Sequence, residues 1–98
     1  DYPSRPPFVR IIRPRFHFHT GHITIGGSIC SEILTSSGWR TNTSIESLLL
    51  YLHSILIDGK ARVVNSANAY HPVPQYDYTE QEAHLAFERV AHDHGWRT

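Results

Sequence analysis

Apolar residues in the middle of the chain recur every three or four positions, which is the spacing of a helix with one buried face. The stripe comprises Ile45, Leu48, Leu49, Leu52, Ile55 and Leu56. Ahead of it, Thr43 and Glu46 match the T-x-x-E capping box, in which each side chain bonds the other residue's backbone N–H. Gly59 follows as the natural stop. The pattern predicts a helix that begins after Thr43 and ends at Gly59.

A second helix is predicted near the C-terminus. Thr79 and Glu82 match another capping box, and Gly95 ends the pattern. Its inner face is formed by Ala83, Ala86, Phe87, Val90 and Ala91. The stretch between the two helices has no periodicity, and its prolines keep it extended.

Strand signals are weaker than helix signals. Residues 8–13 are rich in β-favouring side chains and predict one strand, which Pro14 stops. Residues 15–27 are predicted to be irregular, and one helical turn is expected after Cys30. A single strand is too little to cover two helices. Either the chain has further strands that its sequence pattern does not reveal, or it is a piece of a larger fold.

Composition and charge fit one small globular domain over residues 1–98. The chain has nine Lys and Arg residues and nine Asp and Glu residues. It therefore lacks the excess of positive charge that is typical of proteins that bind nucleic acid or an anionic membrane. No stretch approaches the roughly 18 consecutive apolar residues of a membrane helix, and no signal-peptide pattern opens the chain. The single cysteine excludes an internal disulfide and favours the cytosol or the nucleus.

Histidine is unusually frequent, with eight in the chain. His17, His19 and His22 lie close together, and imidazole is a common zinc ligand. Zinc needs three or four ligands, so a zinc site is one interpretation of this cluster. The other is that these are loop residues without a metal, and we assign no metal site.

The segment GGSICSEIL, residues 26–34, contains the only cysteine, Cys30. Out of context, a lone cysteine is more often a small buried apolar residue than a nucleophile. Here YPSRPP at residues 2–7 precedes this segment, and Trp39 follows it ahead of a capped helix. In this order and spacing the motifs resemble the ubiquitin-conjugating enzymes. SIES at residues 44–47, DGKARV at 58–63 and the terminal Gly-Trp resemble the Q-type branch, which lacks the family's His-Pro-Asn motif.

The resemblance implies an α+β fold in which a four-stranded antiparallel sheet is flanked by helices. The chain would supply the C-terminal portion of this single catalytic domain: a strand, the active-site loop and two helices. The first helix and the first strands would be missing, which would account for the shortage of strands.

The resemblance also implies an activity. Cys30 would carry ubiquitin's C-terminal carboxyl as a thioester and pass it to lysine or hydroxyl acceptors, with no cofactor. Gly26, Gly27 and Ser28 would line the groove for the ubiquitin tail, where missing side chains let the tail run against backbone.

The family usually has an Asn eight residues before the cysteine, but residues 20–22 here read Thr-Gly-His. His22 is expected to replace that Asn, either as a hydrogen-bond donor to the oxyanion or as a general base. The branch also has a histidine shortly before its Gly-Trp. His92 and His94 lie near that position but out of the expected register, and with Trp96 they are candidates for an acceptor site.

Expected partners are ubiquitin or a ubiquitin-like protein and the ubiquitin-activating enzyme. RING-type ligases usually grip a Phe in the Tyr-Pro turn and a Ser-Pro-Ala loop after the Trp, where this chain has Ser4 and Arg-Thr-Asn at residues 40–42. Any ligase is therefore expected to dock in a non-standard way. The alternative function is a catalytically inactive binding module of the same fold with an incidental cysteine.

Overall fold

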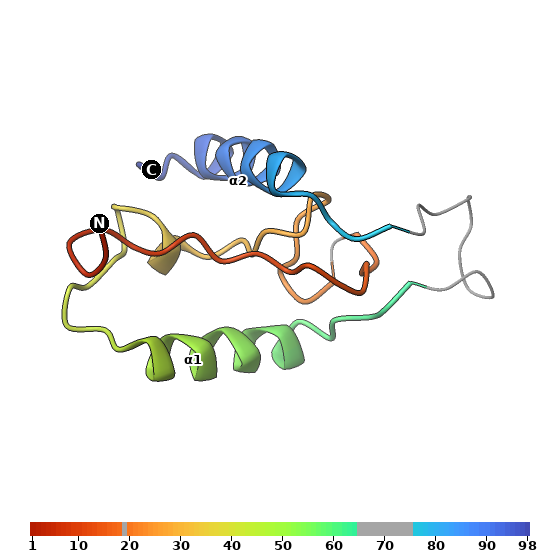
Figure 1. Cartoon of the computed structure of the whole chain (residues 1–98), viewed down its shortest axis with the longest axis horizontal. Coiled ribbons are helices and arrows are strands. Elements are labelled where there is room, and N and C mark those ends of the chain that lie inside the picture. The colour runs from red at the N-terminus through yellow and green to blue at the C-terminus, as the bar shows by residue number, and fades with distance from the viewer. Residues whose placement is uncertain (19, 65–75) are drawn as a thin grey trace.

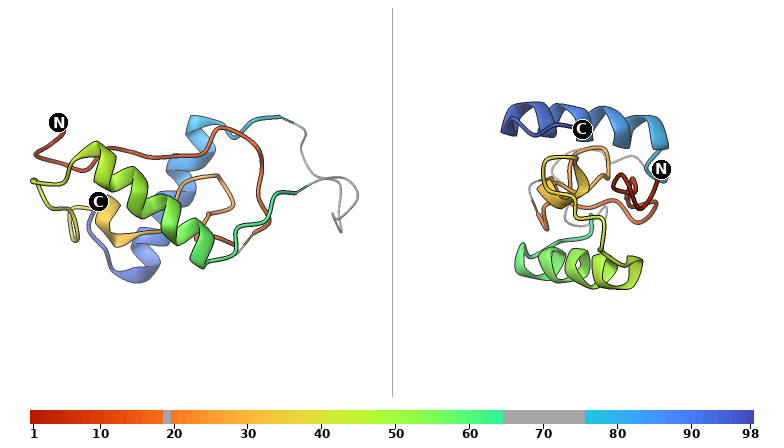
Figure 2. Two further views of the ribbon diagram at one scale, coloured as in Figure 1. Left: turned by 90° about the horizontal axis from the view of Figure 1, so that it is seen from below. Right: turned by 90° about the vertical axis from the view of Figure 1, so that its left-hand side faces the viewer.

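The computed structural model describes residues 1–18, 20–64 and 76–98. Helix α1 (Ile45–Asp58) and helix α2 (Glu80–His94) lie on opposite sides of a central layer of extended segments (Figure 1). The view along the long axis shows the same three layers (Figure 2). A short 3-10 turn, η1 (Glu32–Leu34), interrupts the central layer and confirms the turn expected after Cys30. The segment that carries Cys30 therefore lies between the two helices.

The apolar core crosses the central layer and joins both helices. Ile29 and Leu34 pack with Leu48 and Leu52 of α1 and with Phe87 of α2. Complete burial of such a side chain contributes about 1.5–3 kcal/mol. Because Ile29 and Leu34 stand on either side of Cys30 in the sequence, the core fixes the backbone both before and after the thiol.

Helix α1 begins one residue later than predicted. Its N-cap is Ser44, whose Oγ accepts a hydrogen bond from the Ser47 N–H at 3.1 Å. The capping box predicted for Thr43 and Glu46 is therefore wrong, because Glu46 is the second helical residue and only the third can close the box. The predicted end is confirmed, since the Gly59 N–H caps the helix.

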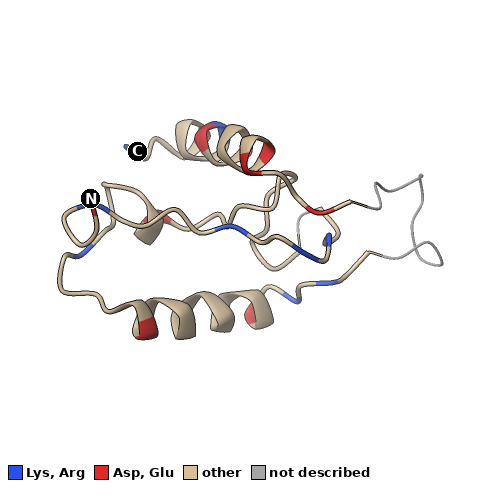
Figure 3. Cartoon of the chain, in the orientation of Figure 1, with Lys and Arg blue, Asp and Glu red and all other residues tan. Residues whose placement is uncertain are grey.

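The predicted apolar stripe of α1 is only partly buried. Leu48 and Leu52 are buried, whereas Ile45 and Leu49 are exposed. Leu50 and Ile57 are exposed as well, and they lie on the side of α1 away from the core. The charged residues of α1 are acidic and stand near its two ends (Figure 3). Apolar side chains thus surround most of this helix.

Helix α2 matches its prediction at both ends. Thr79 and Glu82 form the predicted capping box, and Gly95 ends the helix in the left-handed region with φ of 75°. Ala83, Ala86, Phe87 and Ala91 are buried, as the predicted inner face requires, and Val90 is half-buried. None of the described helices has both the length and the apolar character of a membrane-spanning segment.

The predicted strand at residues 8–13 is wrong, and no continuous strand occurs in the described ranges. This segment is extended, but it pairs with residue 28 in one isolated antiparallel bridge, next to a 2.8 Å hydrogen bond from the Ile11 N–H to the Gly27 carbonyl. The isolated bridges are Arg10–Ser28, Phe16–Val63 and Ile23–Ile29. A strand needs consecutive partners, and no described segment runs beside residues 8–13 for long enough to supply them. The two helices expected of this portion of the α+β fold are present, and no sheet is seen among the described residues.

Candidate active site

Residues 22–30 fold back as a hairpin that presents the cysteine. The Thr24 N–H donates to the Ser28 carbonyl at 2.9 Å, and the two side-chain hydroxyls lie 2.7 Å apart. Toward the open end, the Cys30 N–H donates to the His22 carbonyl at 2.7 Å. Positions 22 and 30 are therefore neighbours across the hairpin. This hairpin is not among the elements predicted from the sequence, although Gly-Gly between two short apolar runs is a known signal for one.

Cys30 is half-buried and lies at the wall of a pocket of about 540 Å³. Its neighbours Ile29 and Ser31 are both buried, so the backbone is held while the thiol reaches the pocket. Burial raises the pKa of the Cys30 thiol above its usual value, because a low-dielectric environment disfavours the thiolate. At neutral pH the sulfur is therefore protonated.

The raised pKa of Cys30 predicts slow alkylation in the folded protein, because the thiolate is the reactive form. At about pH 8, near the ordinary pKa of a thiol, iodoacetamide should modify Cys30 more slowly in folded than in urea-unfolded protein. Mass spectrometry after timed quenching measures both rates. At a pH well above both pKa values only the difference in access should remain. Equal rates at about pH 8 would contradict a raised pKa.

The pocket brings three predicted site residues together: Cys30, His22 and His94. His22 comes from the first arm of the hairpin and is exposed, with its backbone in the left-handed region at φ of 60°. His94 comes from the last turn of α2, which forms the opposite wall together with Val90. A thiol and two imidazoles thus border one open space.

The predicted groove residues are buried. A side chain at Gly26 would overlap the Glu82 carbonyl, with its Cβ 2.7 Å from the carbonyl carbon. A Cβ at Gly27 would lie 2.7 Å from the Tyr78 ring at Cδ2, and Ser28 is completely buried. The two glycines therefore allow α2 and the segment before it to approach the hairpin tip closely. A role of these residues in a ubiquitin-tail groove stays a prediction, and the open surface beside Cys30 is the pocket.

The C-terminal candidates lie in different surroundings. The His94 ring stacks on Trp96 with centroids 4.3 Å apart, and its Nδ1 lies 2.9 Å from the Val90 carbonyl. A carbonyl oxygen can only accept, so Nδ1 carries the proton and Nε2 of the neutral ring is left as an acceptor. His92 is exposed, 3.8 Å from an Asp93 carboxylate oxygen, and neither it nor Trp96 lines the pocket.

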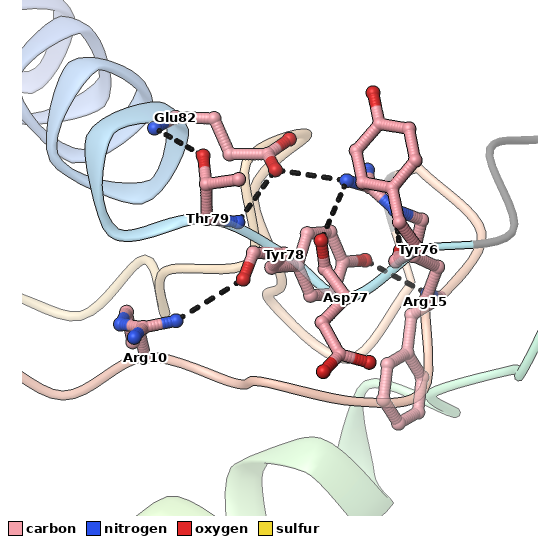
Figure 4. A network of polar contacts seen from close by, with 8 residues as sticks. Arg10, Arg15, Tyr76, Asp77, Tyr78, Thr79 and Glu82 are labelled. Atoms are coloured by element: carbon pink, nitrogen blue, oxygen red, sulfur yellow. Dashed lines mark hydrogen bonds and ion pairs between the residues drawn. The ribbon is translucent and has the colours of Figure 1, made fainter.

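An arginine anchors the first turn of α2 above the hairpin (Figure 4). Arg15 Nη2 lies 2.8 Å from Glu82 Oε2, and its guanidinium covers the rings of Tyr76 and Tyr78 at 4.7 and 4.5 Å. Burial acts to raise the pKa of Glu82, but hydrogen bonds from Thr79 and Arg15 outweigh it and lower that pKa. This network could not be predicted, because nothing in a single sequence links residues 15 and 82. The network holds the start of the helix whose end forms the pocket wall.

The alternative zinc site involves His17, His19 and His22, of which His19 lies outside the described residues. Among the residues that are described, no group of three or more His, Cys, Asp or Glu side chains is placed to hold a metal ion. His22 lies instead at the pocket with Cys30.

Comparison with known proteins identifies the family to which the chain belongs. A family model described as "Ubiquitin-conjugating enzyme" matches residues 1–88. The chain therefore belongs to the ubiquitin-conjugating enzyme family, as its motifs predicted.

Curated relatives place the chain near the Q-type members of that family. It is 36% identical over 99 residues to ubiquitin-conjugating enzyme E2 Q1 of Homo sapiens, which covers all of this chain and 22% of the relative. The protein of the same name from Mus musculus gives the same identity and coverage. The chain is also 35% identical over 97 residues to ubiquitin-conjugating enzyme E2 25 of Caenorhabditis elegans, covering 99% of the chain and 24% of the relative. It thus spans only 22% to 24% of the length of these relatives.

Proposed function

We propose that these 98 residues form the C-terminal portion of a catalytic domain that carries ubiquitin, or a ubiquitin-like protein, as a thioester on Cys30. The observation that supports this most directly is the place of Cys30: it lies in the family's active-site motif and at the wall of an open pocket. A buried structural cysteine would have no such opening.

The transfer needs only the chain's own side chains and the acceptor. A lysine nitrogen or a hydroxyl oxygen of the acceptor forms a bond to the thioester carbonyl carbon, which gives a tetrahedral oxyanion. The bond from that carbon to Cys30 Sγ then breaks, and the electron pair leaves on sulfur. The proton lost by the acceptor goes to a nearby base or to water. The product is an amide or an ester, and Cys30 is free to be loaded again.

The proposed partners follow from family membership. Ubiquitin or a ubiquitin-like protein is the carried group, and the activating enzyme supplies it in an ATP-dependent step. A ligase would dock without the usual apolar anchors, since Ser4 stands in the Tyr-Pro turn. We place the protein in the cytoplasm or the nucleus.

A thioester assay tests the proposal. The full-length protein is incubated with activating enzyme, ubiquitin and Mg-ATP, and half of each sample is treated with reductant before electrophoresis. We expect an adduct one ubiquitin heavier that disappears on reduction, because a thioester is cleaved by thiols. A control without ATP should give no adduct. Absence of a reductant-sensitive adduct with active partners would contradict the proposal.

The inactive binding module remains the second candidate. The observation in its favour is the burial that raises the pKa of Cys30, since a protonated thiol is a poor nucleophile. Such a module would bind ubiquitin or a family partner without forming a covalent adduct. The assay above separates the two functions.

His22 is proposed to assist the transfer step. Its backbone carbonyl accepts a hydrogen bond from the Cys30 N–H, and its exposed side chain borders the same pocket as Cys30. The imidazole N–H can donate to the oxyanion, or the free ring nitrogen can take the acceptor's proton. His94, with Nε2 left as an acceptor, is the C-terminal candidate that faces this pocket, and it is proposed to border the acceptor site.

Replacing His22 by alanine should separate loading from discharge. Loading should stay normal, while discharge of the thioester to lysine should slow by about a hundred-fold, the usual loss when an oxyanion donor or a general base is removed. Single-turnover decay of the purified thioester measures this rate. His22→Asn keeps a donor without a base, so recovery by Asn assigns the donor role and no recovery assigns the base. Discharge at the wild-type rate in His22→Ala would contradict both roles.

A further inference from the structure

Besides the Cys30 thiol and the imidazoles of His22 and His94, the pocket has a wall of apolar side chains. Ile25 and Phe18 border it from the central layer, and Ala86 and Val90 border it from α2. Ile25 is 65% exposed and Phe18 is 57% exposed. These are large apolar surfaces in the immediate surroundings of a proposed nucleophile.

The stability of the hairpin does not require an exposed isoleucine at position 25. The tip is closed by the Thr24–Ser28 hydrogen bonds, and its neighbour Gly26 is packed beneath α2. Ile25 itself takes no part in the core cluster, so a polar residue at this position would cost the fold little. An isoleucine that contributes little to the core and lies at the mouth of a pocket is typical of a binding surface.

Charge at the pocket does not select for acidic or basic ligands. Besides its two imidazoles, the described lining carries Arg89 and Asp93 as charged groups. They stand four positions apart on α2, so they border the same side and their opposite charges offset each other. Contact with the apolar wall is therefore the main property by which this pocket can distinguish one occupant from another.

We propose that the pocket binds an apolar side chain next to the acceptor group, so that the preferred substrates carry a large apolar residue beside the lysine or hydroxyl that receives ubiquitin. This inference rests on the proposed function, since it concerns the acceptor of the Cys30 thioester. Ile25, Phe18 and Val90 are its specificity-determining residues. A pocket of about 540 Å³ with Cys30 in its wall has room for one such side chain while the acceptor group faces the sulfur.

Two capped tripeptides test this preference, one with lysine between two glycines and one with lysine between two leucines. The ubiquitin thioester of the full-length protein is purified, the activating enzyme is stopped, and discharge to each peptide is followed below saturation. We expect the leucine peptide to be about ten-fold faster, because a few buried methylene groups give discrimination of this size.

Ile25→Ser should reduce this ratio toward one. Leu50→Ser is the matched control, since Leu50 is also 65% exposed but lies on α1 and does not line the pocket, so its ratio should stay at the wild-type value. Thermal unfolding checks that the Ile25→Ser protein is folded.

The remaining outcomes overturn the inference in distinguishable ways. A thioester that discharges equally to both peptides leaves the proposed function in place and overturns the preference. Slower loading of Ile25→Ser than of Leu50→Ser would show that the apolar wall holds the tail of the donor and not the acceptor. If no thioester forms at all, the proposed function and this inference fail together.

Discussion

Replacing Cys30 by alanine should abolish every ubiquitin adduct of the protein that is sensitive to reductant. Position 30 is the only cysteine of these 98 residues, so within them no second thiol can take over the acyl group. Cys30→Ser is the more informative variant, because its hydroxyl can form only an oxygen ester. Any adduct of that variant should survive reductant and be cleaved by mild alkali. Electrophoresis with and without reductant measures both variants.

The hairpin itself should survive these two changes. The hydrogen bond that holds position 30 comes from its backbone N–H and not from its side chain. Thermal unfolding close to that of the wild type is therefore the control for both variants. A reductant-sensitive adduct in Cys30→Ala would place the thioester on a cysteine outside this chain and would refute the proposed site.

Gly26→Ala should be among the most destabilising single substitutions in the chain. The added Cβ would overlap the carbonyl of Glu82, in the first turn of α2, and would come within 3.0 Å of the Ala86 Cβ. A helix backbone cannot move aside as a flexible side chain can, so the hairpin tip and α2 must separate. We expect a loss of about 3 kcal/mol in the free energy of unfolding, at the upper end for overpacked sites. Urea unfolding followed by tryptophan fluorescence measures it.

Gly95→Ala provides the comparison for that result. Gly95 has a left-handed backbone with φ of 75°, and an added Cβ would meet nothing within 4 Å. Its cost should be the backbone penalty alone, about 1 kcal/mol. If Gly26→Ala costs no more than Gly95→Ala, the close packing of the hairpin tip against α2 is refuted.

The two helices could be predicted because their signals are local. Apolar spacing and end signals lie within the segment itself, so α2 was predicted correctly from Thr79 to Gly95. The start of α1 was misplaced by one residue because Thr43 and Ser44 are both good caps. Only the hydrogen bond from the Ser47 N–H decides between them.

The extended segments could not be predicted in the same way. A β-favouring composition at residues 8–13 says nothing about which partner runs beside them, and among the described residues Arg10 alone of this segment forms a β-bridge. The hairpin at residues 22–30 is different, since Gly26-Gly27 between two isoleucine-containing runs was a readable signal.

The candidate site was predictable in its residue types and only partly in its geometry. Cys30, His22 and His94 do border one pocket. His92 and Trp96 do not line it, because successive residues at the end of α2 point in different directions. Ile25 and Phe18 were not foreseen, since an exposed apolar residue has no motif.

The main-chain hydrogen bond between positions 22 and 30 has a consequence for how such a protein can evolve. The backbone of Cys30 is held by the carbonyl of residue 22, so the side chain at position 22 can be exchanged without displacing the proposed nucleophile. The exchange is limited by the positive φ of 60°, which histidine, asparagine, aspartate and glycine tolerate and which β-branched residues do not. A lineage could therefore alternate between amide and imidazole at this position, and so change which acceptors react, while the rest of the hairpin stays as it is.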